Sequence, residues 1–147
     1  MESAILAGAI ALVGSYALTP LVHKLAIGFG VIDRPGERRV HEQPTPRWGG
    51  LAVYVAFITA LLAAVAVDPK VGLDDGVAGL LLGGTIVALV GLLDDKYDLS
   101  PLVQIGAIFA GGAVLIAFGS KIDYVNPFGH GISLRWLTIP VTLVWIL

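Results

Sequence analysis

The stretch GVAGLLLGGTIVALVGLL, residues Gly76–Leu93, contains no charged side chain and is followed at once by DDKYDLSP. A helix over this stretch rises about 27 Å, close to the ~30 Å hydrocarbon core of a bilayer. Helices buried in soluble proteins seldom run so far without a charge. The stretch therefore predicts a membrane-spanning helix that ends beside a cluster of carboxylates.

The rest of the chain repeats this pattern. Every Lys, Arg, Asp and Glu lies outside five charge-free runs, which are Ser3–His23, Trp48–Val67, Gly76–Leu93, Leu99–Ser120 and Trp136–Leu147. Only 14% of the residues are charged, against about 25% in a typical soluble domain. The last run is too short to span unaided. It predicts either an interfacial segment or, as we expect, part of a helix in a longer protein.

These runs predict an all-α, polytopic integral membrane helix bundle with about five transmembrane helices, the fifth truncated. We expect one membrane domain over residues 1–147, the N-terminal fragment of a longer chain. Its parts are helices at 3–26, 48–67, 76–94, 101–120 and 136–147, a cytoplasmic loop at 27–47 and a short external β-hairpin at 121–135. The hairpin prediction rests on alternating apolar and polar residues around a Pro/Gly turn.

The basic residues predict the orientation of the bundle. The first and third loops together hold six Lys or Arg, and the second and fourth hold three. Because basic loops stay in the cytoplasm, we expect the N-terminus outside and residues 27–47 and 94–100 in the cytoplasm. The carboxylate cluster and the most basic loop then share one face of the plasma membrane.

Asp94 and Asp95 are the first candidate functional residues. They lie where the third helix ends, and the helix dipole disfavours negative charge at that end. A bound cation would relieve the repulsion, and Mg²⁺ is the natural choice because it takes carboxylate and phosphate oxygens together. The alternative is a solvated loop whose aspartates only mark the membrane boundary, and the spacing leaves both interpretations open.

The second candidate segment is DRPGERRVHEQPTPRWGG, residues Asp33–Gly50. Its prolines hold the chain extended, and its arginines offer forked donors to phosphate oxygens. The same arginines could instead bind anionic lipid headgroups. The residues alone leave these two interpretations equal, and His41 by itself is typical of an ordinary polar loop residue.

Taken together, these segments resemble the polyprenyl-phosphate N-acetylhexosamine-1-phosphate transferase family (glycosyltransferase family 4). The resemblance rests on Asp33–Gly50, on GLLDDKYDLSP at Gly91–Pro101, and on a weaker turn motif at Val125–Gly129. Their order and spacing match over essentially the whole chain. The first loop is closer to the N-acetylglucosamine-type enzymes than to the muramoyl-pentapeptide branch.

The resemblance implies a reaction at the cytoplasmic face. A UDP-sugar, with N-acetylglucosamine as the expected sugar, gives its sugar-1-phosphate to undecaprenyl or another polyprenyl phosphate and releases UMP. This step initiates cell-envelope polysaccharide synthesis. The expected cofactor is Mg²⁺, and the expected partners are the UDP-sugar, the polyprenyl phosphate lipid and the membrane, with no nucleic acid. A homodimer is compatible with the family.

The resemblance also implies roles for individual residues. Asp94 and Asp95 would be catalytic and bind the metal, and whether they also deprotonate the lipid phosphate stays open. His41, Arg47 and Asp98 would bind substrate. Gln104 departs from the family, which commonly has a lysine there. Because family members are longer, we expect the 147-residue chain to be inactive by itself.

Two other functions remain as alternatives. One is transfer of phospho-N-acetylmuramoyl-pentapeptide, the reaction of the neighbouring branch of the family. The other is a non-catalytic membrane transporter or scaffold. A transporter would favour acidic residues inside the helices, whereas every run here is free of charge.

Overall fold

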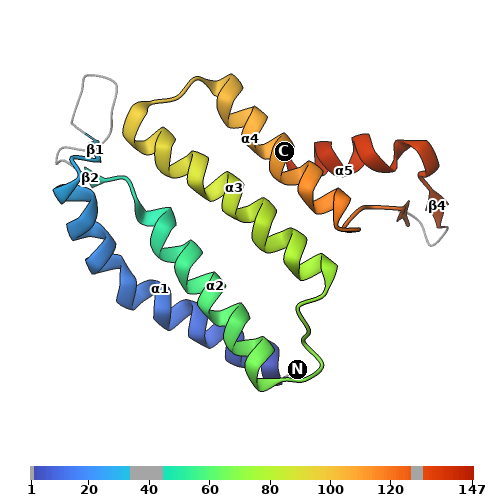
Figure 1. Cartoon of the computed structure of the whole chain (residues 1–147), viewed down its shortest axis with the longest axis horizontal. Helices are drawn as coiled ribbons and strands as arrows, with labels where there is room; N and C mark the ends of the chain where they lie inside the picture. Colours follow the sequence, from blue (N-terminus) through green and yellow to red (C-terminus); the bar gives the residue numbers. More distant parts are fainter. Residues whose placement is uncertain (1, 34–44, 127–130) are drawn as a thin grey trace. The chain divides into compact units, whose positions relative to one another are not determined.

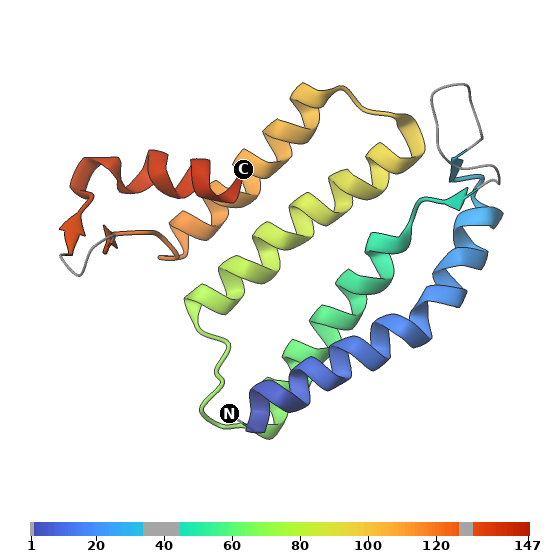
Figure 2. The same ribbon diagram turned by 180° about the vertical axis from the view of Figure 1, so that it is seen from behind.

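Residues 2–33, 45–126 and 131–147 are described by a computed structural model. Within them the chain forms α1 (Glu2–Gly28), β1 (Ile32–Asp33), β2 (Thr45–Pro46), α2 (Gly49–Val67), α3 (Asp75–Tyr97), α4 (Pro101–Ala117), β3 (Tyr124–Val125), β4 (Ile132–Ser133), the 3₁₀ turn η1 (Arg135–Leu137) and α5 (Thr138–Ile146). Figures 1 and 2 show these elements from opposite sides. The predicted all-α membrane class is confirmed.

Three of the helices, at Ser3–Gly28, Gly49–Val67 and Asp75–Tyr97, are long and apolar enough to cross a membrane. Their large apolar side chains are largely exposed, as at Leu12 and Val53. Exposed apolar faces of this extent suit contact with lipid rather than water. Helices α4 and α5 are shorter than predicted, because Gly119 turns the chain with a φ of 88° and η1 replaces the first turn expected at residue 136.

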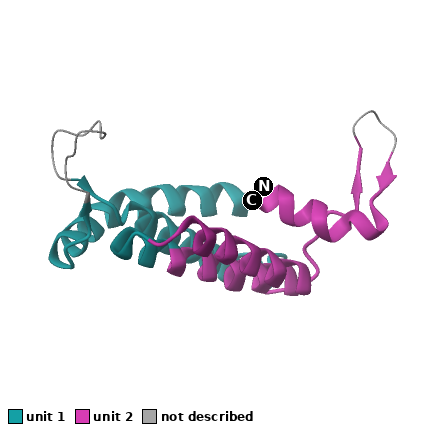
Figure 3. Ribbon diagram, turned by 90° about the horizontal axis from the view of Figure 1, so that it is seen from above, with its two compact units in different colours: residues 1–72, 91–98 teal, residues 73–90, 99–147 magenta. Residues whose placement is uncertain are grey.

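The described residues divide into two compact units (Figure 3). The first comprises residues 1–72 and 91–98, so it holds α1, α2 and the end of α3. Its two long helices lie side by side in both views (Figures 1 and 2). The face of α2 against α1 is a stripe of buried alanines four residues apart, which are Ala52, Ala56, Ala60 and Ala64. Small side chains at this spacing let helix backbones approach closely, which is what holds helices together in lipid.

The second unit comprises residues 73–90 and 99–147. Here α3 and α4 pack through glycines: a Cβ placed on Gly83 would lie 2.6 Å from the carbonyl oxygen of Gly111. The predicted hairpin is present, with Tyr124 paired to Ser133 and Val125 to Ile132 in antiparallel register. The prediction of a single domain and of the hairpin's external location stays a prediction.

The sequence did not predict the pairing of β1 with β2. Ile32 pairs with Pro46 and Asp33 with Thr45, so the segment after α1 returns to the end of that helix. Arg47, the residue after β2, is thereby brought to the end of α1. This short ladder positions the candidate site.

Candidate functional site

The carboxylates form the last turn of α3 and the residue after it. Asp94 and Asp95 are partly buried, whereas Asp98 is exposed. Asp98 has a φ of 48°, and its N–H donates to the carbonyl oxygen of Asp94 over 2.8 Å. A left-handed residue making this bond is a common way to end a helix, and Asp tolerates it better than most residues. The turn therefore holds the three carboxylates at one helix end.

Arg47 is fixed through its backbone on both sides. Its N–H donates to the carbonyl oxygen of Val31 over 3.3 Å, and its own carbonyl oxygen accepts from the N–H of Gly49 over 2.8 Å. The side chain is only 25% exposed, and Nη1 donates to Oδ1 of Asp98 over 2.7 Å. The ion pair thus joins two sequence motifs that lie 51 residues apart.

Asp95 is partly buried and interacts with the charges of Arg47, Asp94 and Asp98. Negative charge at a helix C-terminus is destabilised by the dipole. Arg47 offsets part of that repulsion, and Lys96 adds a second cation in the last turn. The structure therefore brings together four of the five predicted site residues.

The fifth predicted site residue, His41, lies outside the described residues, as do Arg34, Arg38 and Arg39. Gln104 lies at the start of α4, in the other unit, where its amide donates to the carbonyl oxygen of Leu99 over 3.4 Å.

Aromatic residues brace this helix end. The rings of Phe29 and Trp48 lie 5.4 Å apart, and the Trp48 indole donates to the carbonyl oxygen of Leu92 over 3.4 Å. The Lys96 ammonium lies 5.8 Å from the Phe29 ring centre and 5.4 Å from that of Tyr97, both within cation–π range. The sequence did not predict this cluster, although Trp48 and Lys96 fall inside the two motifs.

The place of His23 in the structure was not predicted either. His23 lines a small cavity of about 70 Å³ between α1 and the start of α2, together with Thr19, Trp48 and Gly49. Nothing in the sequence around His23 signals this position, because the cavity depends on the β1–β2 return.

The donor atoms suit one kind of metal site. Within the described residues, no group of three or more His, Cys, Asp or Glu side chains is arranged to hold a metal ion. Asp94 and Asp95 nevertheless offer carboxylate oxygens at one helix end. Mg²⁺ is commonly held by one or two carboxylates, with waters and substrate phosphates completing its shell. The residues therefore fit a Mg²⁺ shared with a phosphorylated substrate, rather than an ion enclosed by protein.

Comparison with known proteins identifies the relatives of this chain. It is 31% identical over 131 residues to the probable undecaprenyl-phosphate N-acetylglucosaminyl 1-phosphate transferase of Bacillus subtilis. The matched region covers 88% of the chain and 35% of the relative. The chain belongs to the polyprenyl-phosphate N-acetylhexosamine-1-phosphate transferase family. No protein-family model matches the chain, and no solved structure matches it significantly.

Two further members of this transferase family match at similar levels. The decaprenyl-phosphate N-acetylglucosaminephosphotransferase of Mycolicibacterium smegmatis is 35% identical over 78% of the chain and 29% of the relative. The undecaprenyl-phosphate alpha-N-acetylglucosaminyl 1-phosphate transferase of Yersinia pestis is 31% identical over 82% of the chain and 34% of the relative. The chain spans about a third of the length of these curated relatives. With its long apolar helices, this family member is a multi-pass membrane protein.

Proposed function

We propose that this chain forms part of an enzyme that transfers N-acetylglucosamine-1-phosphate from a UDP-sugar to a polyprenyl phosphate. The observation that carries the proposal is the Arg47–Asp98 ion pair. It joins the arginine of the first motif to the aspartates of the second, so that a guanidinium and three carboxylates lie at one helix end. Such a set can hold a pyrophosphate and a divalent cation together.

The proposed reaction is an exchange of P–O bonds. An oxygen of the polyprenyl phosphate attacks the phosphorus that carries the sugar, forming the new pyrophosphate bond. The bond from that phosphorus to the UMP oxygen breaks, and UMP leaves with the electron pair. Positioning and charge stabilisation supply most of the catalysis in phosphoryl transfer.

In this scheme the residues of the chain have separate tasks. Asp94 and Asp95 would hold Mg²⁺, and one of them would accept any proton remaining on the attacking phosphate. When bound, Mg²⁺ would neutralise charge on the pyrophosphate. Arg47, held by its backbone and by Asp98, orients phosphate oxygens through its forked N–H groups. His41 remains a proposed substrate contact.

The relatives support the choice of sugar and lipid. Their names specify N-acetylglucosamine or its phosphate and undecaprenyl or decaprenyl phosphate. By analogy we propose a UDP-linked donor, the cytoplasmic face as the site of reaction, and a role in cell-envelope polysaccharide initiation. Homodimer formation stays a prediction.

The first experiment tests the activity itself. The chain is assayed alone and joined to the part of the Bacillus subtilis relative that it does not match. We expect the joined protein to release UMP from UDP-N-acetylglucosamine, given polyprenyl phosphate and Mg²⁺, and the chain alone to release none. Folded joined protein without UMP release would contradict the function. Release only from UDP-N-acetylmuramoyl-pentapeptide would favour the neighbouring branch.

The second experiment tests the aspartates in the joined protein. We expect Asp95→Asn to lower the rate of UMP release by about 10²–10⁴-fold, because a proton acceptor or metal ligand is lost. Asp75→Asn is the matched control: it changes an exposed carboxylate at the other end of the same helix and should leave the rate unchanged. Full activity in Asp95→Asn would remove Asp95 from the mechanism.

A further inference from the structure

The second unit contains a cavity that the proposed reaction does not use. It has a volume of about 390 Å³ and lies between the end of α4, the β3–β4 hairpin and the start of α5. None of the helix-end aspartates lines it. Its volume falls within the range of small-ligand pockets, roughly 300–1,000 Å³.

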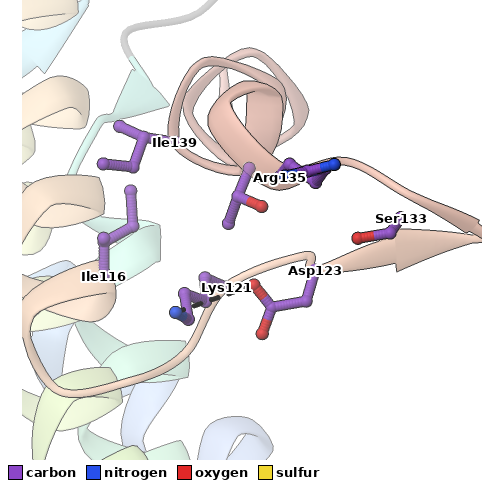
Figure 4. A pocket seen from close by; sticks show the side chains of 7 residues that line it. Ile116, Lys121, Asp123, Ser133, Arg135 and Ile139 are labelled. Atoms are coloured by element: carbon purple, nitrogen blue, oxygen red, sulfur yellow. Dashed lines mark ion pairs between the residues drawn. The ribbon is translucent and has the colours of Figure 1, made fainter.

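The cavity wall is cationic and polar. Figure 4 shows Lys121 and Asp123 on one side of the cavity and Arg135 on the other, with Ser133 on the hairpin. Lys121 and Asp123 form an ion pair of 3.6 Å, and their side chains are 43% and 58% exposed. An exposed pair at this distance contributes little stability, so Lys121 can turn to an incoming anion. Within the described residues, Arg135 makes no ion pair. The charged side chains that line the cavity are Lys121, Arg135 and Asp123, so cations outnumber anions by one.

Hydrogen bonds fix the cavity walls. The N–H of Ile122 donates to Oγ1 of Thr142 over 2.9 Å, which ties the segment before β3 to α5. The N–H of Leu134 donates to the carbonyl oxygen of Asp123 over 2.9 Å, which closes the hairpin base. Arg135 has a φ of 47°, a left-handed conformation that costs a non-glycine residue energy. The fold thus holds Arg135 at the cavity despite a local cost.

The surroundings indicate the depth of this cavity in a membrane. Ile116, on α4, and Ile139, on α5, form its apolar part. Trp136 follows the lining residue Arg135 in the chain, and Tyr124 follows the lining residue Asp123. Their side chains are 81% and 70% exposed. Trp and Tyr side chains are enriched at the headgroup level of a bilayer. The anions available at that level are lipid phosphates.

We propose that this cavity binds the phosphate headgroup of an anionic phospholipid. Lys121 and Arg135 would bind the phosphodiester, Ser133 and Thr138 would offer hydroxyl donors, and the two isoleucines would contact the first acyl carbons. The lipid site is distinct from the proposed sugar-phosphate site and does not depend on the proposed enzyme activity.

The test measures lipid binding to the 147-residue chain in detergent micelles by native mass spectrometry. Dioleoyl-phosphatidylglycerol is the probe, and dioleoyl-phosphatidylcholine and soluble glycerol 3-phosphate are the comparisons. We expect phosphatidylglycerol to bind more tightly than either. Equal binding of phosphatidylcholine would contradict recognition of the anionic headgroup. Equal binding of glycerol 3-phosphate would make the ligand a free phosphate, and the lipid proposal would be wrong.

Variants locate the site. Lys121→Gln and Arg135→Gln should each weaken phosphatidylglycerol binding about five-fold, the effect expected for one cation near a lipid surface. The matched controls Lys24→Gln and Lys70→Gln each remove one positive charge that does not line the cavity, and each should leave binding unchanged. Equal weakening by these controls would show general charge attraction and overturn the proposal.

A further variant separates binding from folding. Arg135→Lys retains the charge and should bind nearly as well as the unchanged chain. If circular dichroism shows that Arg135→Gln has lost helicity, lipid binding by Arg135→Lys and by Lys121→Gln decides whether the proposal holds. Unchanged binding in Lys121→Gln would then overturn the proposal.

Discussion

Asp98 combines two roles that usually fall to different residues. Its backbone ends α3 in a left-handed turn, and its side chain receives the Arg47 guanidinium. Glycine would make the turn at lower cost but could not bind Arg47. Asparagine would keep the turn and lose the charge. An aspartate at this position is therefore explained by local geometry and charge together, without assigning it to substrate.

This dual role predicts different stabilities for two variants. Asp98→Ala should be less stable than Asp98→Gly by about 1–2 kcal/mol, because alanine must adopt the left-handed conformation with its Cβ present. Loss of the exposed ion pair is common to both variants and costs about 0.2–1 kcal/mol. Unfolding in detergent, followed by circular dichroism, measures the difference. Equal stability of the two variants would show that the turn relaxes.

At the scale of elements, the second unit depends on the close approach of α3 and α4. Their backbones meet at Gly83 and Gly111, where either glycine's Cβ would lie under 3 Å from the other's carbonyl oxygen. The atom that an added Cβ would meet belongs to the backbone of the other helix, so it cannot move aside as a flexible side chain could. The two helices would have to separate. Separation would forfeit the packing that stabilises helix pairs in lipid.

Substitution of these glycines should therefore be costly. We expect Gly83→Ala to destabilise the chain by about 1–3 kcal/mol, the usual cost of overpacking. Gly106→Ala on α4 is the matched control, because nothing lies within 4 Å of the added Cβ. It should be neutral or stabilising by roughly 0.5–1 kcal/mol, since alanine favours the helix. A Gly83→Ala variant as stable as Gly106→Ala would contradict the packing described here.

At the scale of the whole molecule, charge-free runs predicted the helices well but not their ends. The run Gly76–Leu93 became a helix from Asp75 to Tyr97, because charges end the contact with hydrocarbon without ending the hydrogen-bond ladder. The Arg47–Asp98 pair was beyond prediction from spacing alone. The long loop holds several arginines, and it is the β1–β2 return that places Arg47 at the helix end.

The orientation of the chain is a prediction that its composition makes easy to test. The sequence has no cysteine, so Ser3→Cys and Ser100→Cys each introduce a single thiol. Ser100 makes no side-chain cap bond to α4, so its replacement should be mild. We expect a membrane-impermeant maleimide to label Ser3→Cys in intact cells and Ser100→Cys only in opened membranes. The reverse pattern would invert the predicted topology.

The length of α3 has a consequence for the membranes in which the protein can work. The helix rises about 27 Å from Gly76 to Leu93 and about 6 Å more to Tyr97, so Asp94 and Asp95 lie at the edge of a ~30 Å hydrocarbon core. A thinner bilayer can be matched by helix tilt, but a thicker one draws the carboxylates toward the acyl chains, where their charge is costly. The acyl-chain length of the surrounding lipid thus bears directly on how far the candidate site stands from the hydrocarbon core.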